Sequence, residues 1–466
     1  MVRASRLLIP REIKVLIAAA FVIALGYGLV APVLPQFAQS FDVGVTASSV
    51  IVSAFAFTRL VFAPAGGQLL EKFGERPVYI WGLLIVALST AACAFAGTYW
   101  QLLLFRGLGG IGSTMFTISA MGLIIRLAPA GVRGRVSGLY ASSFLVGNIV
   151  GPLVGGLLAG FGMQVPFLVY AVALLIAAGG VAWQLKDAVG PAEGSGTASA
   201  GASPVSGQDA ADEAVAAAGP VQGEPVTEVA AEAGTAGRAA SGSSSGDGRT
   251  AGRAGRDTRP RLTVREALQD SAYRAALASS FANGWSSFGV RNSLLPLFAA
   301  AVLSGGSETA GIALTFFAGG TALALLFSGR LTDSWGRRPM VLSGLALNAA
   351  ATAVIGFTDN VPLFLAVSAL AGLGTGMLNP AQQAAVADVV GNERNGGKVL
   401  AAFQMTADSG AIIGPILAGV LADTLGYEWA FALTGAVALL AFLVWLGARE
   451  TLAGRPAART GSTIEE

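Results

Sequence analysis

Four charged side chains lie inside long apolar stretches of the sequence: Arg59, Arg106, Arg291 and Asp408. A charge at the centre of a membrane helix costs about 2.5 to 3.5 kcal/mol on insertion scales, so each needs a function or a partner. Asp408 lies about ten residues past Lys398, which puts it roughly 15 Å deep at about 1.5 Å per residue of helix. It is the deepest acid, and a desolvated carboxyl can bind and release a proton.

The absence of histidine limits the chemistry that these charges can perform. It excludes zinc sites built on histidine, Ser-His-Asp triads and haem ligation by histidine. The single cysteine, Cys93, cannot form an internal disulfide and lies in an apolar stretch. Gly107, Gly109 and Gly112 match the pattern G-x-G-x-x-G, but no strand precedes them and no acid follows at the required spacing, which argues against a dinucleotide site. We therefore predict no metal, no cofactor and no enzymatic activity.

The composition indicates that most of the chain lies in a membrane. Of the 466 residues, 54% are hydrophobic and 12% are charged, whereas soluble domains carry about 25% charged residues. Windows of about 20 apolar residues, the length that crosses a bilayer as a helix, recur along the chain. The expected spans lie near 14–38, 47–70, 78–97, 101–127, 136–161, 165–185, 272–302, 310–331, 340–357, 362–388, 398–425 and 429–447. The sequence therefore predicts an all-α integral membrane protein with twelve transmembrane helices in two six-helix bundles.

These spans divide the chain into two bundles and three flanking segments. The divisions are an N-terminal segment 1–13, a first bundle 14–185, a linker 186–262, a second bundle 263–447 and a tail 448–466. The first span is about twice as long as the apolar part of a signal peptide, so we expect it to be retained. The linker is dominated by Ala, Gly, Ser, Pro and Glu, which predicts a disordered spacer. Its arginine-rich end either enforces topology or rests on anionic lipid headgroups.

The distribution of Lys and Arg predicts the orientation, because these residues are held on the cytoplasmic side. Alternate loops are basic, and the short turns between them contain no Lys or Arg. The basic residues of the loops and the tail are Lys72, Arg76, Arg133, Arg135, Arg337, Arg338, Arg394, Lys398, Arg449, Arg455 and Arg459. We therefore expect a multi-pass plasma-membrane protein with both termini in the cytoplasm. We expect a monomer in the lipid bilayer, and the net charge of +2 gives no basis for binding nucleic acid.

The two halves repeat each other at an offset near 262 residues. The paired segments are YGLVAPVLPQF (27–37) with FGVRNSLLPLF (288–298), GQLLEKFGERP (67–77) with GRLTDSWGRRP (329–339), GLGGIG (107–112) with GLGTGM (372–377), and GNIVGPLVGG (147–156) with GAIIGPILAG (410–419). Duplicated halves joined by a linker are typical of transporters, in which a substrate cavity lies between the halves near the middle of the membrane.

These segments resemble the major facilitator superfamily over both halves, leaving out the linker and the tails. GRLTDSWGRRP fits the loop signature G-x-L-a-D-r-x-G-R-R almost fully, and Arg106 with the following glycines resembles the helix 4 signature. GNIVGPLVGG matches the helix 5 signature of antiporters, especially drug exporters. The resemblance implies a secondary active transporter that works by alternating access, with proton-coupled efflux of small amphipathic compounds, including drugs. The alternatives are a metabolite transporter for a sugar, amino acid or siderophore, and a substrate sensor that does not transport.

The helix 5 signature places small residues on one helix face. Gly147, Gly151 and Gly155 recur every four residues, so a neighbouring helix can approach closely, and Pro152 favours a bend. In the antiporters that the sequence resembles, this face is thought to seal the halves against leak; plain tight packing is the alternative. The residues of this face and its counterpart in the second half are Gly147, Gly151, Pro152, Gly155, Gly156, Gly410, Gly414 and Pro415.

The two copies of the loop signature predict gating contacts. By resemblance, Glu71 meets the start of the eleventh helix near Gly396 and Gly397, and Asp333 meets the start of the fifth near Gly134, in the outward-facing state only. Two charge exchanges at the same offset further predict the ion pairs Glu75–Arg126 and Arg337–Asp388. The candidate gating residues are Gly67, Glu71, Glu75, Arg76, Arg126, Gly329, Asp333, Arg337, Arg338 and Asp388.

Proton coupling and substrate binding complete the prediction. Many exporters of this family keep the proton-carrying acid in helix 1 or 4, but helix 1 has none here. Because histidine is also absent, Asp408 is the leading proton carrier; a structural role for Asp408 between the halves is the alternative. Arg106 is the second candidate for proton coupling, as a residue that orients or tunes a carboxyl or the substrate, with plain packing as its alternative. The resemblance implies that helices 1, 4, 7 and 10 form the cavity walls. Their aromatic and amide side chains would suit bulky, partly apolar and cationic compounds. The cavity candidates are Tyr27, Phe116, Phe281, Asn283, Trp285, Phe288, Arg291, Asn379 and Gln383.

Overall fold

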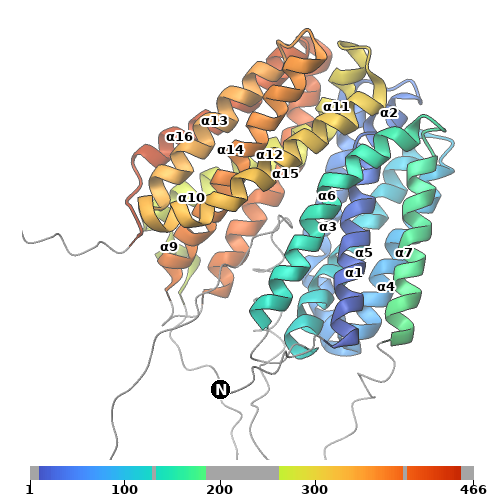
Figure 1. The fold of residues 1–466 in the computed structure, drawn as a ribbon, viewed down its shortest axis with the longest axis horizontal. Helices are drawn as coiled ribbons and strands as arrows, with labels where there is room; N and C mark the ends of the chain where they lie inside the picture. Colours follow the sequence, from blue (N-terminus) through green and yellow to red (C-terminus); the bar gives the residue numbers. More distant parts are fainter. Residues whose placement is uncertain (1–9, 128–132, 185–261, 392–395, 453–466) are drawn as a thin grey trace, which may run out of the picture.

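The computed structural model describes residues 10–127, 133–184, 262–391 and 396–452, and these ranges are helical with no strand. The predicted linker therefore lies outside the described residues except for residue 262, as do residues 1–9 of the N-terminal segment and the tail from residue 453. Within the described ranges, the expected division into two helical bundles is confirmed (Figure 1).

Within the described residues, the first bundle contains seven helices, because the first predicted span is divided after Val30. Its helices are α1 (Arg11–Val30), α2 (Leu34–Gln39), α3 (Val45–Phe73), α4 (Glu75–Ala94), α5 (Tyr99–Leu127), α6 (Arg133–Ala159) and α7 (Val165–Gln184). Apolar side chains from α1, α4 and α7 form its core, including the fully buried Leu16, Tyr79 and Phe167. The first span thus crosses the bundle as α1 and continues as α2 at one end.

The second bundle repeats this arrangement. Its helices are α9 (Val264–Ala267), α10 (Ser271–Asn283), the π-helix η2 (Gly284–Val290), α11 (Arg291–Ala301), α12 (Gly306–Trp335), α13 (Arg337–Ile355), α14 (Val361–Val390), α15 (Gly397–Thr424) and α16 (Tyr427–Leu446). Eleven of the described helices are each long and apolar enough to cross a membrane. The continuous run α10–η2–α11 provides the twelfth membrane-length helix, since π-helical turns interrupt its α-helical geometry without ending it.

One glycine in each copy of the loop signature separates two long helices. Gly74 joins α3 to α4 with a φ of +79°, and Gly336 joins α12 to α13 with a φ of +116°. Side chains with a Cβ are strained at such φ values, so both positions require glycine. The sharp reversal brings the charged residues of each signature to one end of the bundles. This end is called the basic end below.

The outer surface is strongly apolar. Phe161, Trp183 and Leu326 are 82%, 79% and 75% exposed, and large aliphatic side chains lie exposed along most helices. Exposed apolar surface on this scale is costly in water but matches hydrocarbon. The described helices therefore belong in a lipid bilayer, as the composition predicts.

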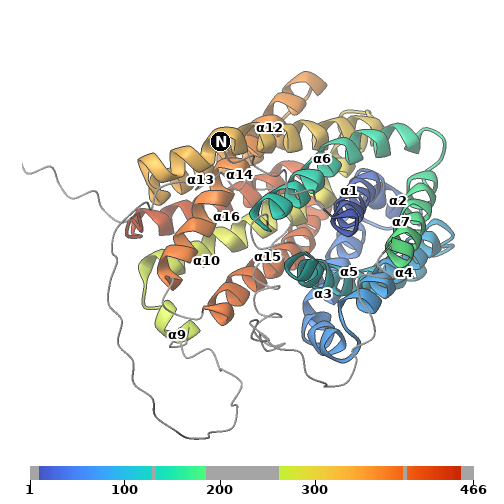
Figure 2. The same cartoon turned by 60° about the horizontal axis from the view of Figure 1, so that its bottom comes forward.

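The two bundles meet at the end opposite the basic end and spread apart toward the basic end (Figures 1 and 2). At the closed end, which we call the α2–α11 end, the side chain of Gln36 donates to the carbonyl of Pro296 at 3.1 Å and accepts from Ser307 at 2.6 Å. Deeper in the interface, Ser53 donates to the carbonyl of Ile412 at 2.8 Å. The structure is therefore closed at the α2–α11 end.

Candidate functional site

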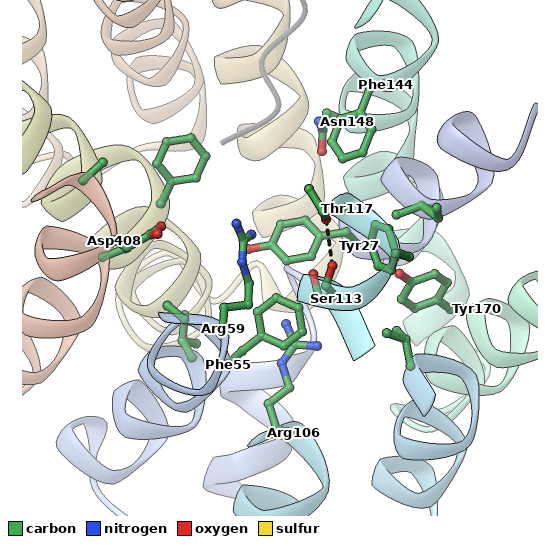
Figure 3. Close-up of a pocket in the computed structure, with 18 of the residues that line it drawn as sticks. Tyr27, Phe55, Arg59, Arg106, Ser113, Thr117, Phe144, Asn148, Tyr170 and Asp408 are labelled. Carbon is green, nitrogen blue, oxygen red and sulfur yellow. Dashed lines mark hydrogen bonds between the residues drawn. The ribbon is translucent and has the colours of Figure 1, made fainter. Parts of the chain in front are cut away.

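A central cavity lies between the bundles and is lined mostly by the first bundle. The space among its lining atoms, open solvent included, is about 1180 Å³, which suits a drug-sized ligand. Its main lining residues from the first bundle are Tyr27, Phe55, Arg59, Arg106, Phe116, Thr117, Tyr140, Phe144, Asn148 and Tyr170. The second bundle contributes Phe288, Ala407, Asp408 and Ala411. Figure 3 shows the cavity as an aromatic chamber with a few charged side chains.

Asp408 and Arg59 face each other across this cavity (Figure 3). Asp408 comes from α15 in the second bundle, and Arg59 comes from α3 in the first. Asp408 is half-buried, and Arg59 is the cation that interacts electrostatically with its carboxylate. The acid that the sequence places deepest in the membrane thus lines the cavity where the two bundles face each other.

Arg106 approaches the same cavity from α5. Its guanidinium lies over the ring of Phe55 at 4.2 Å and near that of Tyr27 at 6.0 Å. The side chain is 9% exposed, and its Nε has no hydrogen-bond acceptor. Arg106 therefore lines the cavity on the side of the first bundle, away from Asp408 (Figure 3).

A second, smaller cavity adjoins the first and shares Tyr27, Asn148 and Phe288 with it. It contains Arg291, which is 3% exposed and stacks on the ring of Phe317 at 3.6 Å. The prediction is therefore confirmed for four of the cavity candidates: Tyr27, Phe116, Phe288 and Arg291. Of these, Phe116 lines the larger cavity.

Other predicted cavity residues lie inside the second bundle instead. Asn283 donates to the side-chain oxygen of Asn379 at 2.9 Å, and both residues are buried. Trp285 donates from Nε1 to the hydroxyl of Thr434 at 3.2 Å and packs near Phe281 at 5.9 Å. These side chains connect helices of one bundle, so the prediction that they line the cavity is wrong in this state.

The structure also places Gln383 outside the two cavities. Gln383 is exposed on α14, whereas Gln382 is buried and hydrogen-bonds Asn379 at 3.1 Å and Ser279 at 2.9 Å. Neighbouring residues on a helix point about 100° apart, so a single step moves the amide from the interior to the surface.

Sequence reasoning missed a stripe of cavity residues on α6. Tyr140, Phe144 and Asn148 are spaced by four residues and all line the larger cavity. The spacing itself was a usable signal, because it places three aromatic or polar side chains on one face of a helix. The sequence identifies Arg59 as an intramembrane charge without assigning it to the site.

The glycine face of α6 packs against α1 within the first bundle. A Cβ on Gly151 or Gly155 would lie 2.5 Å or 2.2 Å from the carbonyl oxygen of Leu25 or Leu29. Gly147 likewise faces Ala24 of α1. The three glycines thus allow close packing inside one bundle; they do not lie between the two halves.

The neighbouring positions on α6 do reach the other bundle. A Cβ on Gly156 would lie 2.7 Å from the carbonyl of Ser307, and the carbonyl of Pro152 lies against Gly311 of α12. The counterparts on α15 pack mainly within the second bundle: Gly410 and Gly414 face α10 and η2, and Pro415 lies against Gly289. The signature therefore supports both packing within a bundle and contact between the halves, through different residues.

Both predicted ion pairs are present at the basic end. Arg126 Nη1 lies 3.0 Å from Glu75 Oε2, and Arg337 Nε lies 3.1 Å from Asp388 Oδ2. Arg337 also contacts Asp333 at 2.8 Å. The two pairs occupy equivalent places in the two bundles, with acid and base exchanged.

The second basic residue of each signature holds the last helix of its bundle. Arg76 donates from Nη2 to the carbonyl of Ala182 at 2.8 Å near the end of α7. Arg338 donates to the carbonyls of Trp445 and Leu446 at the end of α16. Cations stabilise helix C-termini, so these contacts join each loop to its own bundle. Gly67 and Gly329 are half-buried on α3 and α12.

The residues after α16 reinforce the basic end of the second bundle. Glu450 accepts the backbone N–H groups of Arg337 and Arg338 at 2.9 and 3.0 Å, at the N-terminus of α13. Burial raises the pKa of Glu450, but backbone N–H donors outweigh it and leave the pKa below its ordinary value. The side-chain hydrogen bond from Arg449 lowers the pKa of Asp270, which precedes α10. The start of the tail thus forms part of the folded bundle.

We expect the charges of the pair in the first bundle to be exchangeable, because the second bundle carries the opposite arrangement. Glu75→Arg or Arg126→Glu alone places like charges together and should lower the apparent melting temperature of the purified protein. The double variant should restore it, with a coupling of up to about 1 kcal/mol for this partly exposed pair. A double variant whose loss equals the sum of the two single losses would show that the pair does not interact.

Asp423 forms the most extensive polar contact between the bundles. Its carboxylate accepts the backbone N–H groups of Val45 and Thr46, both at 2.8 Å, and the Thr46 hydroxyl at 2.6 Å. These donors lie at the N-terminus of α3, whose N-cap residue Gly44 offers no side-chain acceptor. A carboxylate from the second bundle therefore caps a helix of the first, which stabilises closure of the α2–α11 end.

We expect Asp423→Asn to shift the population toward forms that are open at the α2–α11 end. Charge-assisted hydrogen bonds contribute about 1.5 to 3 kcal/mol, and about 1.4 kcal/mol corresponds to a tenfold change in population. Spin labels at Thr98 and Asp359, which are exposed at this end of the two bundles, would report longer distances. Glu428→Gln is the matched control, and equal distance distributions for both variants would argue against this role of Asp423.

The fold and the site define a class: a membrane protein of two repeated helical bundles with a charged aromatic cavity between them. A family model described as Major Facilitator Superfamily matches residues 16–244 and 276–464. The chain belongs to the major facilitator superfamily.

Curated relatives are similar over part of the chain. Multidrug resistance protein 2 of Bacillus subtilis is 31% identical over 38% of this chain and 44% of its own length. The quinolone resistance protein NorA of Staphylococcus aureus is 34% identical over 34% of this chain and 40% of its own. The class H tetracycline resistance protein of Pasteurella multocida is 32% identical over 35% of this chain and 41% of its own. The matches thus span less than half the length of these relatives.

Solved structures share the fold along nearly the whole chain. A bacterial homologue of the human lysosomal transporter Spinster, in an inward-facing and unoccupied conformation, superposes with a TM-score of 0.71. It is 13% identical, and the match covers 95% of this chain and 97% of that one. At this low sequence identity, the similarity shows that the two proteins share a fold.

Proposed function

We propose that this protein is a secondary active transporter that exports amphipathic compounds in exchange for protons by alternating access. The observation that carries the proposal is the central cavity, where Asp408 of one bundle faces Arg59 of the other. A carboxyl at this place can bind a proton from either side as the bundles rock, while the aromatic lining holds an apolar ligand. The names of the relatives, which concern resistance to drugs, support export.

The direction of access follows from the predicted orientation. With the basic end in the cytoplasm, closure at the α2–α11 end corresponds to an inward-facing state. Asp333 binds Arg337 within its own bundle in this state, and Glu71 is exposed. In the outward-facing state we propose that Glu71 meets the start of α15 and Asp333 meets the start of α6, which would close the basic end. A monomer in the plasma membrane suffices for this cycle.

The test uses purified protein in vesicles with a pH-sensitive dye inside. A quinolone and tetracycline, added as a concentration gradient, should drive proton movement in the opposite direction, and an uncoupler should abolish the pH signal but not the exchange of labelled compound. Compound movement without proton movement would overturn proton coupling and favour a facilitated metabolite or drug carrier. Specific binding without any movement would point to a sensor of the same fold.

A further inference from the structure

The two adjoining cavities contain an excess of positive charge. Arg59, Arg106 and Arg291 line them, and Asp408 is the acidic residue among their lining residues. Because Asp408 faces Arg59, the single carboxylate balances one arginine (Figure 3). The charge without a counterion therefore lies at Arg106 and Arg291.

Arg106 has aromatic neighbours but no acid. The rings of Phe55 and Tyr27 cover its guanidinium, and its other titratable neighbours are Cys93 and Tyr170, neither of which is a carboxylate. Within the described ranges, no carboxylate lies within ion-pair distance of this side chain. Its buried Nε has no acceptor.

Arg291 shows the same arrangement in the second bundle. The ring of Phe317 covers one face of its guanidinium, and its buried Nε and Nη1 have no acceptor. At 3% exposure it is more deeply buried than Arg106. Stacking on an aromatic ring uses the face of the guanidinium and leaves the N–H groups along its edge free.

Arg76, Arg337 and Arg338 at the basic end differ from these two arginines because each of them donates side-chain hydrogen bonds, although the buried Nε of Arg76 has no acceptor either. Arg337 donates to Asp388, to Asp333 and to the carbonyl of Thr332. Arg338 donates to two carbonyls at the end of α16. A buried donor without an acceptor is destabilising, and more so when it is charged. The free donors of Arg106 and Arg291 are therefore best explained by a ligand that supplies the missing acceptor.

We infer that the central cavities bind amphipathic aromatic anions, whose acidic group is held by Arg106 or Arg291 and whose ring system lies among the aromatic side chains. Guanidinium stays protonated and binds planar carboxylates through two parallel hydrogen bonds. Tyr27 and Phe288 line both cavities, so an aromatic body can lie between the two arginines. The inference rests on the proposed function and replaces the cationic substrate that the sequence suggested.

Three probes with one ring system separate charge from shape: 2-naphthoate, 2-naphthamide and 2-naphthylmethylammonium. Binding to the purified full-length protein would be measured by isothermal titration calorimetry. We expect naphthoate to bind at least about tenfold more tightly than the other two, the scale of one charge-assisted hydrogen-bonded contact. Equal or tighter binding of the amide or the ammonium, or no binding of naphthoate at millimolar concentration, would overturn the inference.

Variants assign the effect to the two arginines. Arg106→Met and Arg291→Met should each weaken naphthoate binding by about tenfold while changing naphthamide binding by less than about threefold, because only the anion uses the charge. Arg106→Lys and Arg291→Lys keep the charge and should retain the preference for naphthoate even if a methionine variant does not fold. Arg274→Met, at an exposed position on α10, is the control. An unchanged preference in every folded variant would contradict the assignment.

The outcomes distinguish this inference from the proposed function. Selective naphthoate binding without proton movement in the vesicle assay would overturn proton-coupled export and leave the anion site. Proton-coupled export together with preferential binding of the ammonium probe would overturn the anion site and leave export.

Discussion

Asp408→Asn is expected to abolish proton movement during transport while leaving exchange of labelled substrate across the membrane intact. Asparagine has nearly the shape of aspartate but cannot bind and release a proton at the point where α15 faces Arg59. The measurement is the pH signal in vesicles alongside exchange of labelled compound on both sides. Exchange without net driving force needs only alternating access, so it separates the proton step from the conformational cycle.

A matched control is available in Asp359→Asn, because Asp359 is exposed on a turn at the α2–α11 end and contacts the neighbouring Asn360. This variant should transport normally. Wild-type proton movement in Asp408→Asn would show that another group carries the proton. Loss of exchange together with a lower melting temperature would instead support the alternative that Asp408 is a structural partner between the bundles.

Gly155→Ala is expected to destabilise the first bundle and to reduce transport strongly. The added Cβ would lie 2.2 Å from the carbonyl oxygen of Leu29 and 2.7 Å from its Cα, so α1 and α6 must move apart. Both contacts are with backbone, which cannot rotate away as a side chain can. Overpacking of this kind costs about 1 to 3 kcal/mol. It also displaces α1 and α6, whose Tyr27 and Tyr140 side chains line the cavity.

Gly138→Ala, on the same helix, provides the matched control. A Cβ at Gly138 would meet nothing within 4 Å, so this change should leave melting temperature and transport at the wild-type level. The comparison uses the apparent melting temperature and the vesicle assay for both variants. Equal behaviour of the two variants would mean that the contact between α1 and α6 is not tight, and that the glycine spacing has another cause.

The ion pairs in and next to the loop signatures show which contacts can be predicted from the sequence. Glu75–Arg126 and Arg337–Asp388 were predictable because a duplication places equivalent residues in equivalent surroundings, and an exchange of charge at both members of a pair implies contact. The spans were predictable for a similarly general reason. A bilayer requires long apolar helices, whose length and composition are visible without any knowledge of packing.

The amino-acid sequence alone therefore determined the family, the two bundles and the loop ion pairs, and it identified Asp408 as an acid within an apolar helix. Only the tertiary structure decided which side chains share a cavity. In an apolar helix every face is hydrophobic, so periodicity does not show which face meets a neighbour, and Gln382 could not be told from Gln383. The π-helix η2 further rotates the residues that follow it, such as Arg291, relative to a regular α-helix. The charge balance of the cavity became visible only once both bundles were packed together, because Asp408 and the arginines come from different helices.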